Sequence, residues 1–341
     1  MTTTILKYAY STGDIRVDND HLSQNFPELN INRLEKKVGI KTRYRSIVST
    51  YENAVKSVSN LNLCDEDIKS IDYIIYCTQH ETSNIPNDAF LLHEYFKFSE
   101  TTETLYTNLG CSAYPTLLNY AFALNKKEKS RVLVVTTEKY SSSINANDAI
   151  NNYLFSDIAT SIVFEIEGPR PKYKSGTVSS GMKNLCIPAK IPLIEGDKSQ
   201  YFYMNGQAVF GFSQSAVEQL NKDLSITEDM IVIPHQANEF MIKSMKNKIN
   251  SKNIIINFHE FGNSVSSTIP LAIIIMLEKG EFTNGKYALL GFGVGLAYSG
   301  IINMGFILLG ISTNSFSGIE ASVLYVFIYS LSFLFFIFII N

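Results

Sequence analysis

The first half of the chain alternates short apolar runs with stretches that carry apolar residues at helical spacing. Apolar runs bounded by turn residues predict buried strands, and apolar residues at helical spacing predict helices. The predicted order is strand, helix, short strand, helix and strand, over residues 71–78, 89–96, 103–107, 114–124 and 131–136. Strands and helices that alternate with short links predict parallel sheets covered by helices, which is an α/β fold.

The second half of the chain repeats this order. The same succession is predicted over residues 230–234, 239–248, 253–257, 264–278 and 287–290. A repeated order of elements predicts two similar βαβαβ halves. Gly168, Pro169 and Pro171 indicate the link between them, so we expect halves over residues 1–168 and 169–303.

The remaining segment, residues 304–341, differs in composition. No charged residue follows Glu320, and residues 323–340 consist only of Val, Leu, Ile, Phe, Tyr and Ser. This length is close to the minimum of roughly 17–20 residues for a membrane-spanning helix. We therefore expect an apolar tail outside the catalytic core, with membrane contact through residues 323–340. The alternative is a buried terminal helix.

Composition excludes several classes of protein. Hydrophobic residues make up 45% and charged residues 18% of the chain, as in a globular protein, and a net charge of −3 argues against a nucleic-acid partner. The four cysteines are far apart and have no histidine at metal-ligand spacing, so neither disulfides nor a metal site is expected. The N-terminus lacks the apolar core of a signal peptide, which predicts a cytoplasmic protein.

Cys111 lies where a predicted strand turns into a predicted helix. The positive end of the helix dipole and its unpaired N–H groups favour the thiolate, which is the nucleophilic form of cysteine. Gly110 allows the sharp turn. The alternative interpretation is a buried structural cysteine.

Two further polar residues lie at equivalent strand ends. His235 directly follows the strand over residues 230–234, and Asn263 precedes a helix of the second half as Cys111 precedes one in the first. In open parallel sheets, ligand sites lie beyond the carboxyl ends of the strands. A thiol there can carry an acyl group, while an imidazole and an amide can stabilise an enolate oxygen. Taken singly, the histidine could be structural and the asparagine a helix cap.

A glycine-rich loop, residues 291–296, follows the last predicted strand. It lacks the third glycine of the dinucleotide-binding spacing and has no acidic partner. We instead expect its exposed N–H groups to face the thiol and form an oxyanion hole together with the N–H of Cys111.

In combination these motifs resemble those of the β-ketoacyl-ACP synthase III family of the thiolase superfamily. The matching segments run in order from residue 4 to residue 303. They are Val38-Gly39-Ile40 with Arg43, Gly110-Cys111, Leu154 to Asp157, Met204 to Phe210, Pro234 to Asn238, Phe261 to Ser264, and Gly291 to Gly295. The resemblance implies a thiolase-like fold with α-β-α-β-α layers and a homodimer.

The resemblance also implies an activity, a decarboxylative Claisen condensation of malonyl-ACP with an acyl primer on Cys111. His235 and Asn263 would hold the malonyl thioester carbonyl, and the amides of Cys111 and Val294 would form the oxyanion hole. Acyl carrier protein and acyl thioesters are the implied partners, and no cofactor is expected. The residues expected to contact substrate are Gln236, Asn238, Gly293, Gly295, Arg33 and Lys37.

Three positions depart from the family pattern. Arg33 replaces a tryptophan that stacks on the adenine of coenzyme A, and Lys37 and Phe240 replace arginines. These changes predict altered contacts with the adenine and phosphates of coenzyme A. They indicate a specialised member of the family.

Lys243, Lys246 and Lys248 are predicted on one helix. They are interpreted either as a docking patch for an acidic carrier protein or as a solvated face. Two rival functions remain open. One is a transfer of the acyl group from Cys111 to an alcohol or amine, and the other is a catalytically inactive scaffold.

Overall fold

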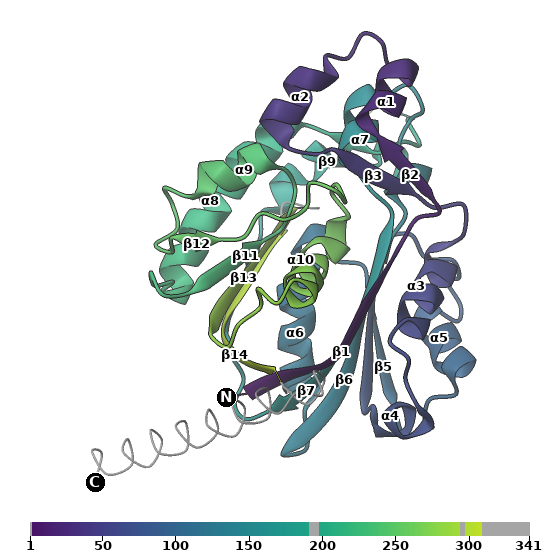
Figure 1. Cartoon of the computed structure of the whole chain (residues 1–341), viewed down its shortest axis with the longest axis vertical. Helices are drawn as coiled ribbons and strands as arrows, with labels where there is room; N and C mark the ends of the chain where they lie inside the picture. Colours follow the sequence, from purple (N-terminus) through teal and green to yellow (C-terminus); the bar gives the residue numbers. More distant parts are fainter. Residues whose placement is uncertain (1, 191–197, 294–296, 309–341) are drawn as a thin grey trace.

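The computed structural model describes residues 2–190, 198–293 and 297–308 (Figure 1). Its centre is a 10-stranded sheet in which β12-β11-β13-β14-β1-β7-β6-β4-β5 are neighbours and β8 pairs with β14. The strands of the first half are β1 (Thr2–Thr12), β4 (Tyr73–Cys77), β5 (Glu103–Thr107), β6 (Lys129–Glu138) and β7 (Ile158–Glu167). Those of the second half are β8 (Lys172–Thr177), β11 (Ile231–Pro234), β12 (Asn253–Ile254), β13 (Lys286–Gly293) and β14 (Ala297–Leu308).

The predicted duplication is confirmed by the strand pairing. In the first half, β5, β4 and β6 are parallel neighbours, and β7 and β1 are then added antiparallel. In the second half, β12, β11 and β13 are parallel, and β14 and β8 are added antiparallel. The expected parallel pairing holds for these three strands of each half, and antiparallel pairs are added because the last strand of each half runs back beside the strand before it.

The helices complete a five-layer arrangement. Helices α6 (Ala113–Leu124) and α10 (Thr268–Glu278) lie between the two halves of the sheet (Figure 1). Helices α3 (Thr50–Ser59) and α5 (Asp88–Phe96) cover the outer face of the first half, and α8 (Gly206–Leu224) and α9 (Glu239–Met245) cover that of the second. The predicted α-β-α-β-α layering is confirmed.

Alternating side chains build the separate core regions. Ile75 packs toward α6 and α10, whereas its neighbour Ile74 packs toward α3 and α5. In the second half, Leu289 faces the central helices and Leu290 faces α8 and α9. Successive residues of a strand point to opposite faces, so each strand needs apolar residues at every position when both faces are covered.

Shorter elements complete the fold, and most of them lie at the end of the molecule opposite to α4 (Figure 1). β2 pairs antiparallel with β3, and β9 pairs antiparallel with β10. The remaining elements are β2 (Ile15–Asp18), α1 (Asn19–Asn25), α2 (Ile31–Val38), β3 (Thr42–Arg45), α4 (Asp65–Ser70), η1 (Gly110–Ser112), η2 (Tyr140–Ser142), α7 (Ala149–Leu154), η3 (Ser179–Asn184), β9 (Leu185–Cys186), η4 (Pro188–Lys190), β10 (Tyr203–Met204) and η5 (Val265–Ser267).

The predicted boundary at residue 303 is corrected by β14, which continues to Leu308. Its last residues pair in parallel with β1, where Thr3, Thr4 and Ile5 face Phe306, Ile307 and Leu308. The strand therefore continues through the boundary and joins the two halves of the sheet. Within the described residues, no helix is long and apolar enough to cross a membrane, and the predicted span over residues 323–340 lies outside them.

This register yields a prediction about truncation. A chain ending at Leu308 is expected to keep the Tm of the full-length protein, because the pairing of β1 with β14 is intact. A chain ending at Asn303 loses the partners of Thr3 to Ile5 and is expected to melt several degrees lower, roughly the effect of 1–2 kcal/mol. Thermal unfolding followed by circular dichroism measures the difference, and equal Tm values for both truncations would contradict it.

Candidate active site

Cys111 lies where the sequence predicted, at the turn from β5 into α6. It belongs to η1, and it is 8% exposed. Gly110 has a φ of +60°, and a Cβ there would lie 2.7 Å from Oε1 of Gln79. A glycine is therefore needed both for the backbone conformation and for the close packing of the turn.

The end of β13 approaches the thiol closely enough to require glycine. A Cβ on Gly293 would lie 2.5 Å from Cβ and 3.0 Å from Sγ of Cys111, and a Cβ on Gly291 would lie 2.9 Å from Cα of Ser112. The glycine-rich segment thus faces the thiol, as expected. Val294 and Gly295, predicted for the oxyanion hole and for substrate contact, lie outside the described residues.

We expect Gly293→Ala to slow acylation of Cys111 by at least about tenfold, because the methyl group would overlap the nucleophile and force it to shift. Intact-protein mass spectrometry of the acyl adduct over time measures the rate. Gly211→Ala is a matched control for the mutation itself, since Gly211 lies in α8 outside the cavity lining and a Cβ there meets nothing within 4 Å. An unchanged acylation rate in Gly293→Ala would contradict the close approach.

His235 directly follows β11 and is 3% exposed. Its backbone N–H donates to the carbonyl of Leu290 at 2.7 Å, which ties it to β13. Its Nδ1 lies 2.6 Å from Oγ1 of Thr268, the first residue of α10. The Thr268 hydroxyl has one proton and also lies 3.0 Å from the carbonyl of Val265. When it donates to Nδ1 instead, the neutral ring carries its proton on Nε2 and can donate from there. Sequence reasoning missed Thr268, because only the fold brings α10 against β11.

Asn263 is 6% exposed and is held on both sides by backbone contacts. Its N–H donates to the carbonyl of Leu154, and its own carbonyl accepts from the N–H of Ser156, each at 2.9 Å. The side-chain Oδ1 accepts from the N–H of Val265 at 3.0 Å. Because Oδ1 is engaged, Nδ2 is the end of the amide that can donate to a ligand. The Leu154 to Asp157 motif therefore positions this asparagine.

One cavity joins the three predicted catalytic residues. It has a volume of about 470 Å³, and Cys111, His235 and Asn263 all line it. Gly293 and Asn238 line it too, while Oδ1 of Asn238 also caps α9 by accepting from the N–H of Met241 at 2.8 Å. The rest of the lining is mostly apolar. The structure thus brings together side chains that the sequence places in separate motifs.

Gln236 does not line this cavity, which corrects its predicted substrate contact. It is 1% exposed, and its Nε2 donates to the carbonyls of Pro234 and Ile255 at 2.7 and 3.2 Å. Its Oε1 accepts from the N–H of Asn257 at 3.2 Å. The side chain therefore ties β11 to the segment after β12, because a buried amide must satisfy both its donor and its acceptor groups.

Two of the residues that depart from the family pattern, Lys37 and Phe240, line the solvent-exposed mouth of the cavity. Nζ of Lys37 lies 4.9 Å from the centroid of the Phe240 ring, and this ring stacks on Phe210 at 5.2 Å. Lys37, Phe240 and Phe210 line the cavity, whereas Arg33 is exposed on α2 and does not. Among the residues that the structure describes, the mouth of the cavity therefore combines the rings of Phe210 and Phe240 with the ammonium group of Lys37.

The predicted docking lysines do not share one helix, since α9 ends at Met245. Lys243 pairs with Glu239 at 2.5 Å, and Lys248, beyond the helix, pairs with Glu218 at 3.0 Å. Lys246 is the exposed residue at the end of α9. Two of the three charges are thus balanced locally, which weakens the attraction of this face for an acidic partner.

Burial sets the protonation of the site histidine. Removal from water lowers the pKa of His235 from 6.5 to about 3, because burial disfavours the charged ring. The imidazole is therefore neutral at ordinary pH, and it donates from Nε2 in the tautomer whose Nδ1 accepts from Thr268. By contrast, burial raises the pKa of the Cys77 thiol to about 12, so this cysteine is not a nucleophile.

This shift predicts the dependence on pH. The decarboxylation rate is expected to show no titration step near 6.5, because folded His235 takes up a proton only near pH 3. The unfolded chain takes up that proton below 6.5, so this group lowers the free energy of unfolding as the pH falls from 6.5 toward 3. Release of CO₂ across this range tests the first point, and a step near 6.5 that disappears in His235→Gln would contradict it.

A buried thiol at a helix start, facing a neutral imidazole and an amide from a duplicated half, defines a thiolase-like enzyme of acyl transfer. Two family profiles match the chain, 3-oxoacyl-(acyl-carrier-protein (ACP)) synthase III over residues 107–181 and its C-terminal domain over residues 221–303. The chain belongs to the β-ketoacyl-ACP synthase III family.

Individual relatives agree with this assignment. The chain is 28% identical to β-ketoacyl-(acyl-carrier-protein) synthase III 2 of Bacillus cereus, covering 79% of this chain and 85% of the relative. It is also 28% identical to the β-ketoacyl-(acyl-carrier-protein) synthase III of Clostridium novyi, covering 83% and 92%. A crystal structure of a 3-oxoacyl-(acyl-carrier-protein) synthase III superposes with a TM-score of 0.80 at 24% identity over 90% of this chain and all of the other, which confirms the thiolase-like fold.

Proposed function

We propose that this protein is a condensing enzyme that forms a β-ketoacyl thioester from malonyl-ACP and an acyl primer carried on Cys111. The observation that carries the proposal is the single cavity lined by Cys111, a neutral His235 and the oriented amide of Asn263. The thiol supports covalent acyl transfer, and the two donors support stabilisation of an enolate.

The first step loads the primer. The thiolate of Cys111 attacks the carbonyl carbon of an acyl thioester, and the carrier thiol leaves with a proton. Malonyl-ACP then binds with its thioester oxygen near Nε2 of His235 and Nδ2 of Asn263. Its bond to the carboxylate breaks, CO₂ leaves, and the electron pair forms an enolate whose charge those donors stabilise.

The enolate carbon then attacks the carbonyl of the Cys111 thioester. A carbon–carbon bond forms, the Cys111 thiolate leaves, and β-ketoacyl-ACP is the product. No metal or resident cofactor is needed for this sequence. The arrangement differs from a general-base site, because a ring that remains neutral to about pH 3 acts as a donor rather than a proton acceptor.

We expect a carrier-bound primer rather than coenzyme A as the donor. Phe210, Phe240 and Lys37 offer apolar surface and one charge near the mouth, without the tryptophan that would stack on adenine. Both donors present the same pantetheine arm. The preference for one donor should therefore depend on contacts with the rest of the carrier, which is a protein in one case and a nucleotide in the other. Lys246 and Lys37 are among the exposed cations available to an acidic carrier protein on this side.

Release of CO₂ from labelled malonyl-ACP tests the proposed function. The proposal expects release that depends on a loaded primer and is accompanied by a β-ketoacyl-ACP product. An acyltransferase to an alcohol or amine would consume the acyl-enzyme without releasing CO₂. An inactive scaffold would take up no acyl mass on Cys111.

The assembly that we propose is a homodimer in the cytoplasm, with contact near β5. In the sheet of the described residues, β5 is a terminal strand, and its free edge is the kind of surface that a second copy covers. Sedimentation of the protein tests the dimer. Membrane contact through residues 323–340 stays a prediction of the sequence, and fractionation of the full-length chain beside the chain ending at Leu308 tests it.

A further inference from the structure

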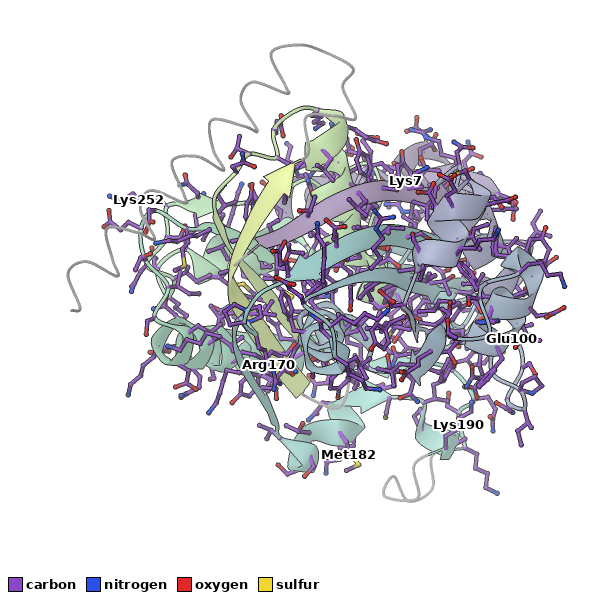
Figure 2. The ribbon with its side chains drawn as sticks, turned by 90° about the horizontal axis from the view of Figure 1, so that it is seen from below. Lys7, Glu100, Arg170, Met182, Lys190 and Lys252 are labelled. Carbon is purple, nitrogen blue, oxygen red and sulfur yellow. The ribbon has the colours of Figure 1, made fainter. Side chains whose placement is uncertain are left out.

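A second cavity, of about 280 Å³, lies beside the catalytic one. Tyr140, Leu185 and Phe202 line both, so they form a shared wall. The far side of this wall carries polar groups, since Gln79, His80 and Ser143 also line the second cavity. Met182 and Lys190, which contribute to the lining from η3 and η4, lie on the same edge of the molecule in Figure 2.

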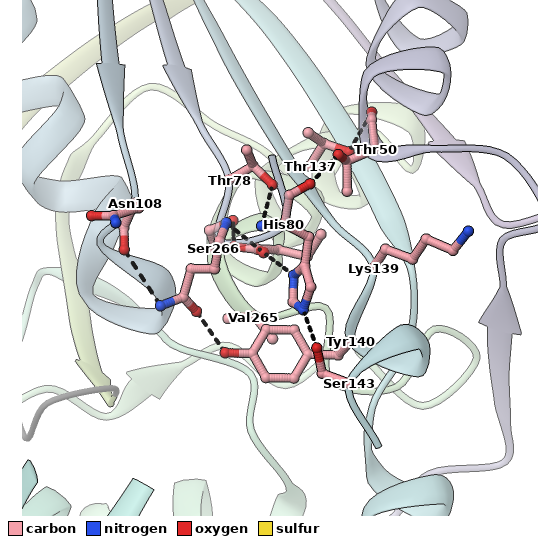
Figure 3. Close-up of polar contacts among 12 residues, drawn as sticks. Thr50, Thr78, His80, Asn108, Thr137, Lys139, Tyr140, Ser143, Val265 and Ser266 are labelled. Carbon is pink, nitrogen blue, oxygen red and sulfur yellow. Dashed lines mark hydrogen bonds and ion pairs between the residues drawn. The ribbon is translucent and has the colours of Figure 1, made fainter. Parts of the chain in front are cut away.

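The polar groups form a continuous hydrogen-bonded chain (Figure 3). Oγ of Ser143 lies 3.0 Å from Nε2 of His80, and Nδ1 of His80 lies 3.3 Å from Oε2 of Glu138. Glu138 is fully buried and also accepts from the hydroxyl of Ser266 at 2.7 Å and from the N–H of Gln79 at 3.1 Å. The reaction described above uses none of these side chains.

Neighbouring contacts hold this chain in place. The His80 ring packs edge-on against Tyr140, with 4.8 Å between centroids, and the Tyr140 hydroxyl donates to Oε1 of Gln79 at 2.5 Å. The N–H of Ser141 donates to Asp157 at 3.0 Å, which fixes the backbone two residues before Ser143. A polar group held by packing and by further hydrogen bonds is preorganised to bind a ligand.

The hydrogen-bond chemistry indicates the class of ligand. An ionised Glu138 only accepts, so Nδ1 of His80 carries a proton and donates to it. With neutral His80, the Ser143 hydroxyl donates to Nε2 and offers lone pairs to a ligand. With protonated His80, Nε2 donates to Ser143, whose own proton is then free for a ligand. A ligand hydroxyl can both donate and accept, so it fits either state.

The shared wall also restricts which acyl chains can reach Ser143 and His80. The rings of Tyr140, Phe155 and Phe202 pack on one another with centroids 4.9–5.2 Å apart. Cys111 belongs to the same packed cluster. Cys111 therefore lies on the apolar side of this wall, and an acyl chain on it must pass between the wall's side chains to reach the polar groups.

We propose that the second cavity is a polar subsite for the primer, and that it selects an acyl thioester whose chain carries a hydroxyl group, which hydrogen-bonds to Ser143 and His80. This rests on the proposed function in that the chain is an acyl group presented to Cys111. Ser143 and His80 determine specificity and take no part in bond making.

Binding to the Cys111→Ala protein tests this without turnover. Calorimetry compares butyryl-pantetheine with its 3-hydroxy and 4-hydroxy derivatives. We expect one hydroxy derivative to bind about tenfold more tightly than butyryl, the effect of one well-placed hydrogen bond. In Ser143→Ala and in His80→Leu, each combined with Cys111→Ala, this ratio is expected to fall to near one.

Ser142→Ala is the matched control, because Ser142 is exposed, does not line this cavity, and donates to the carbonyl of Lys139 at 2.7 Å. It should keep the wild-type ratio. Equal binding of butyryl and both hydroxy derivatives would overturn the subsite. So would a covalent acyl adduct on Ser143 in the Cys111→Ala protein, since the serine would then be a nucleophile. Failure of CO₂ release with the binding ratio retained would instead count against the proposed function alone.

Discussion

Replacement of Cys111 by serine is expected to abolish the acyl-enzyme, with a loss of roughly a hundredfold or more in the rate of acylation. A serine hydroxyl needs a base to become a nucleophile, whereas a thiol ionises readily at the start of a helix. The imidazole of His235, which lines the same cavity, is too weak a base for this, because burial lowers its pKa to about 3. Intact-protein mass spectrometry after incubation with an acyl thioester measures the adduct.

Cys64→Ser is the matched control for this substitution. Cys64 is exposed, and its thiol contacts Asp67 at 3.2 Å, far in the fold from the cavity. This variant should be acylated as fast as the wild type. A Cys111→Ser protein that gained the acyl mass at a comparable rate would show that another residue carries the acyl group.

The second large effect is expected on decarboxylation, when a donor that stabilises the enolate is removed. His235→Ala and Asn263→Ala should each slow decarboxylation about 10²–10³-fold, as removal of one oxyanion-hole donor does. Acylation of Cys111 should remain largely intact, because neither donor is needed for that step. The two half-reactions are measured separately, as adduct mass and as CO₂ release.

Conservative variants separate loss of a donor from structural damage. His235→Gln retains an N–H donor and should recover part of the decarboxylation rate. Asn263→Asp keeps the shape but puts an acceptor where Nδ2 donates, so it should be as slow as alanine. Equal loss of both half-reactions in His235→Ala and Asn263→Ala would mean that these residues support the fold or act on Cys111 instead.

The sequence by itself predicted that Cys111, His235 and Asn263 would meet at one site, because parallel α/β folds place ligand sites at strand ends. Cys111 and Asn263 precede equivalent central helices, and His235 ends a strand, so the repeated order of elements was enough to group them. The duplication itself was visible for the same reason, since strand and helix periods are local properties of the chain.

Other features depended on contacts between residues far apart in the sequence. The neighbour of His235, Gln236, turns inward to satisfy backbone groups, which no local pattern distinguishes from contact with substrate. The end of the core depended on strand pairing, because only the register between β1 and β14 carries the sheet to Leu308.

The polar subsite is the clearest case of a feature that only the tertiary structure decided. His80 could be placed at a strand end from the sequence, but its partners come from other segments. Glu138 lies 58 residues and Ser143 lies 63 residues further along the chain. The local signal for Glu138 was that it is a charged residue at the end of the apolar strand β6. Hydrogen bonds at this separation follow from how β4, β6 and the loop after β6 pack, and single-sequence patterns do not record such packing.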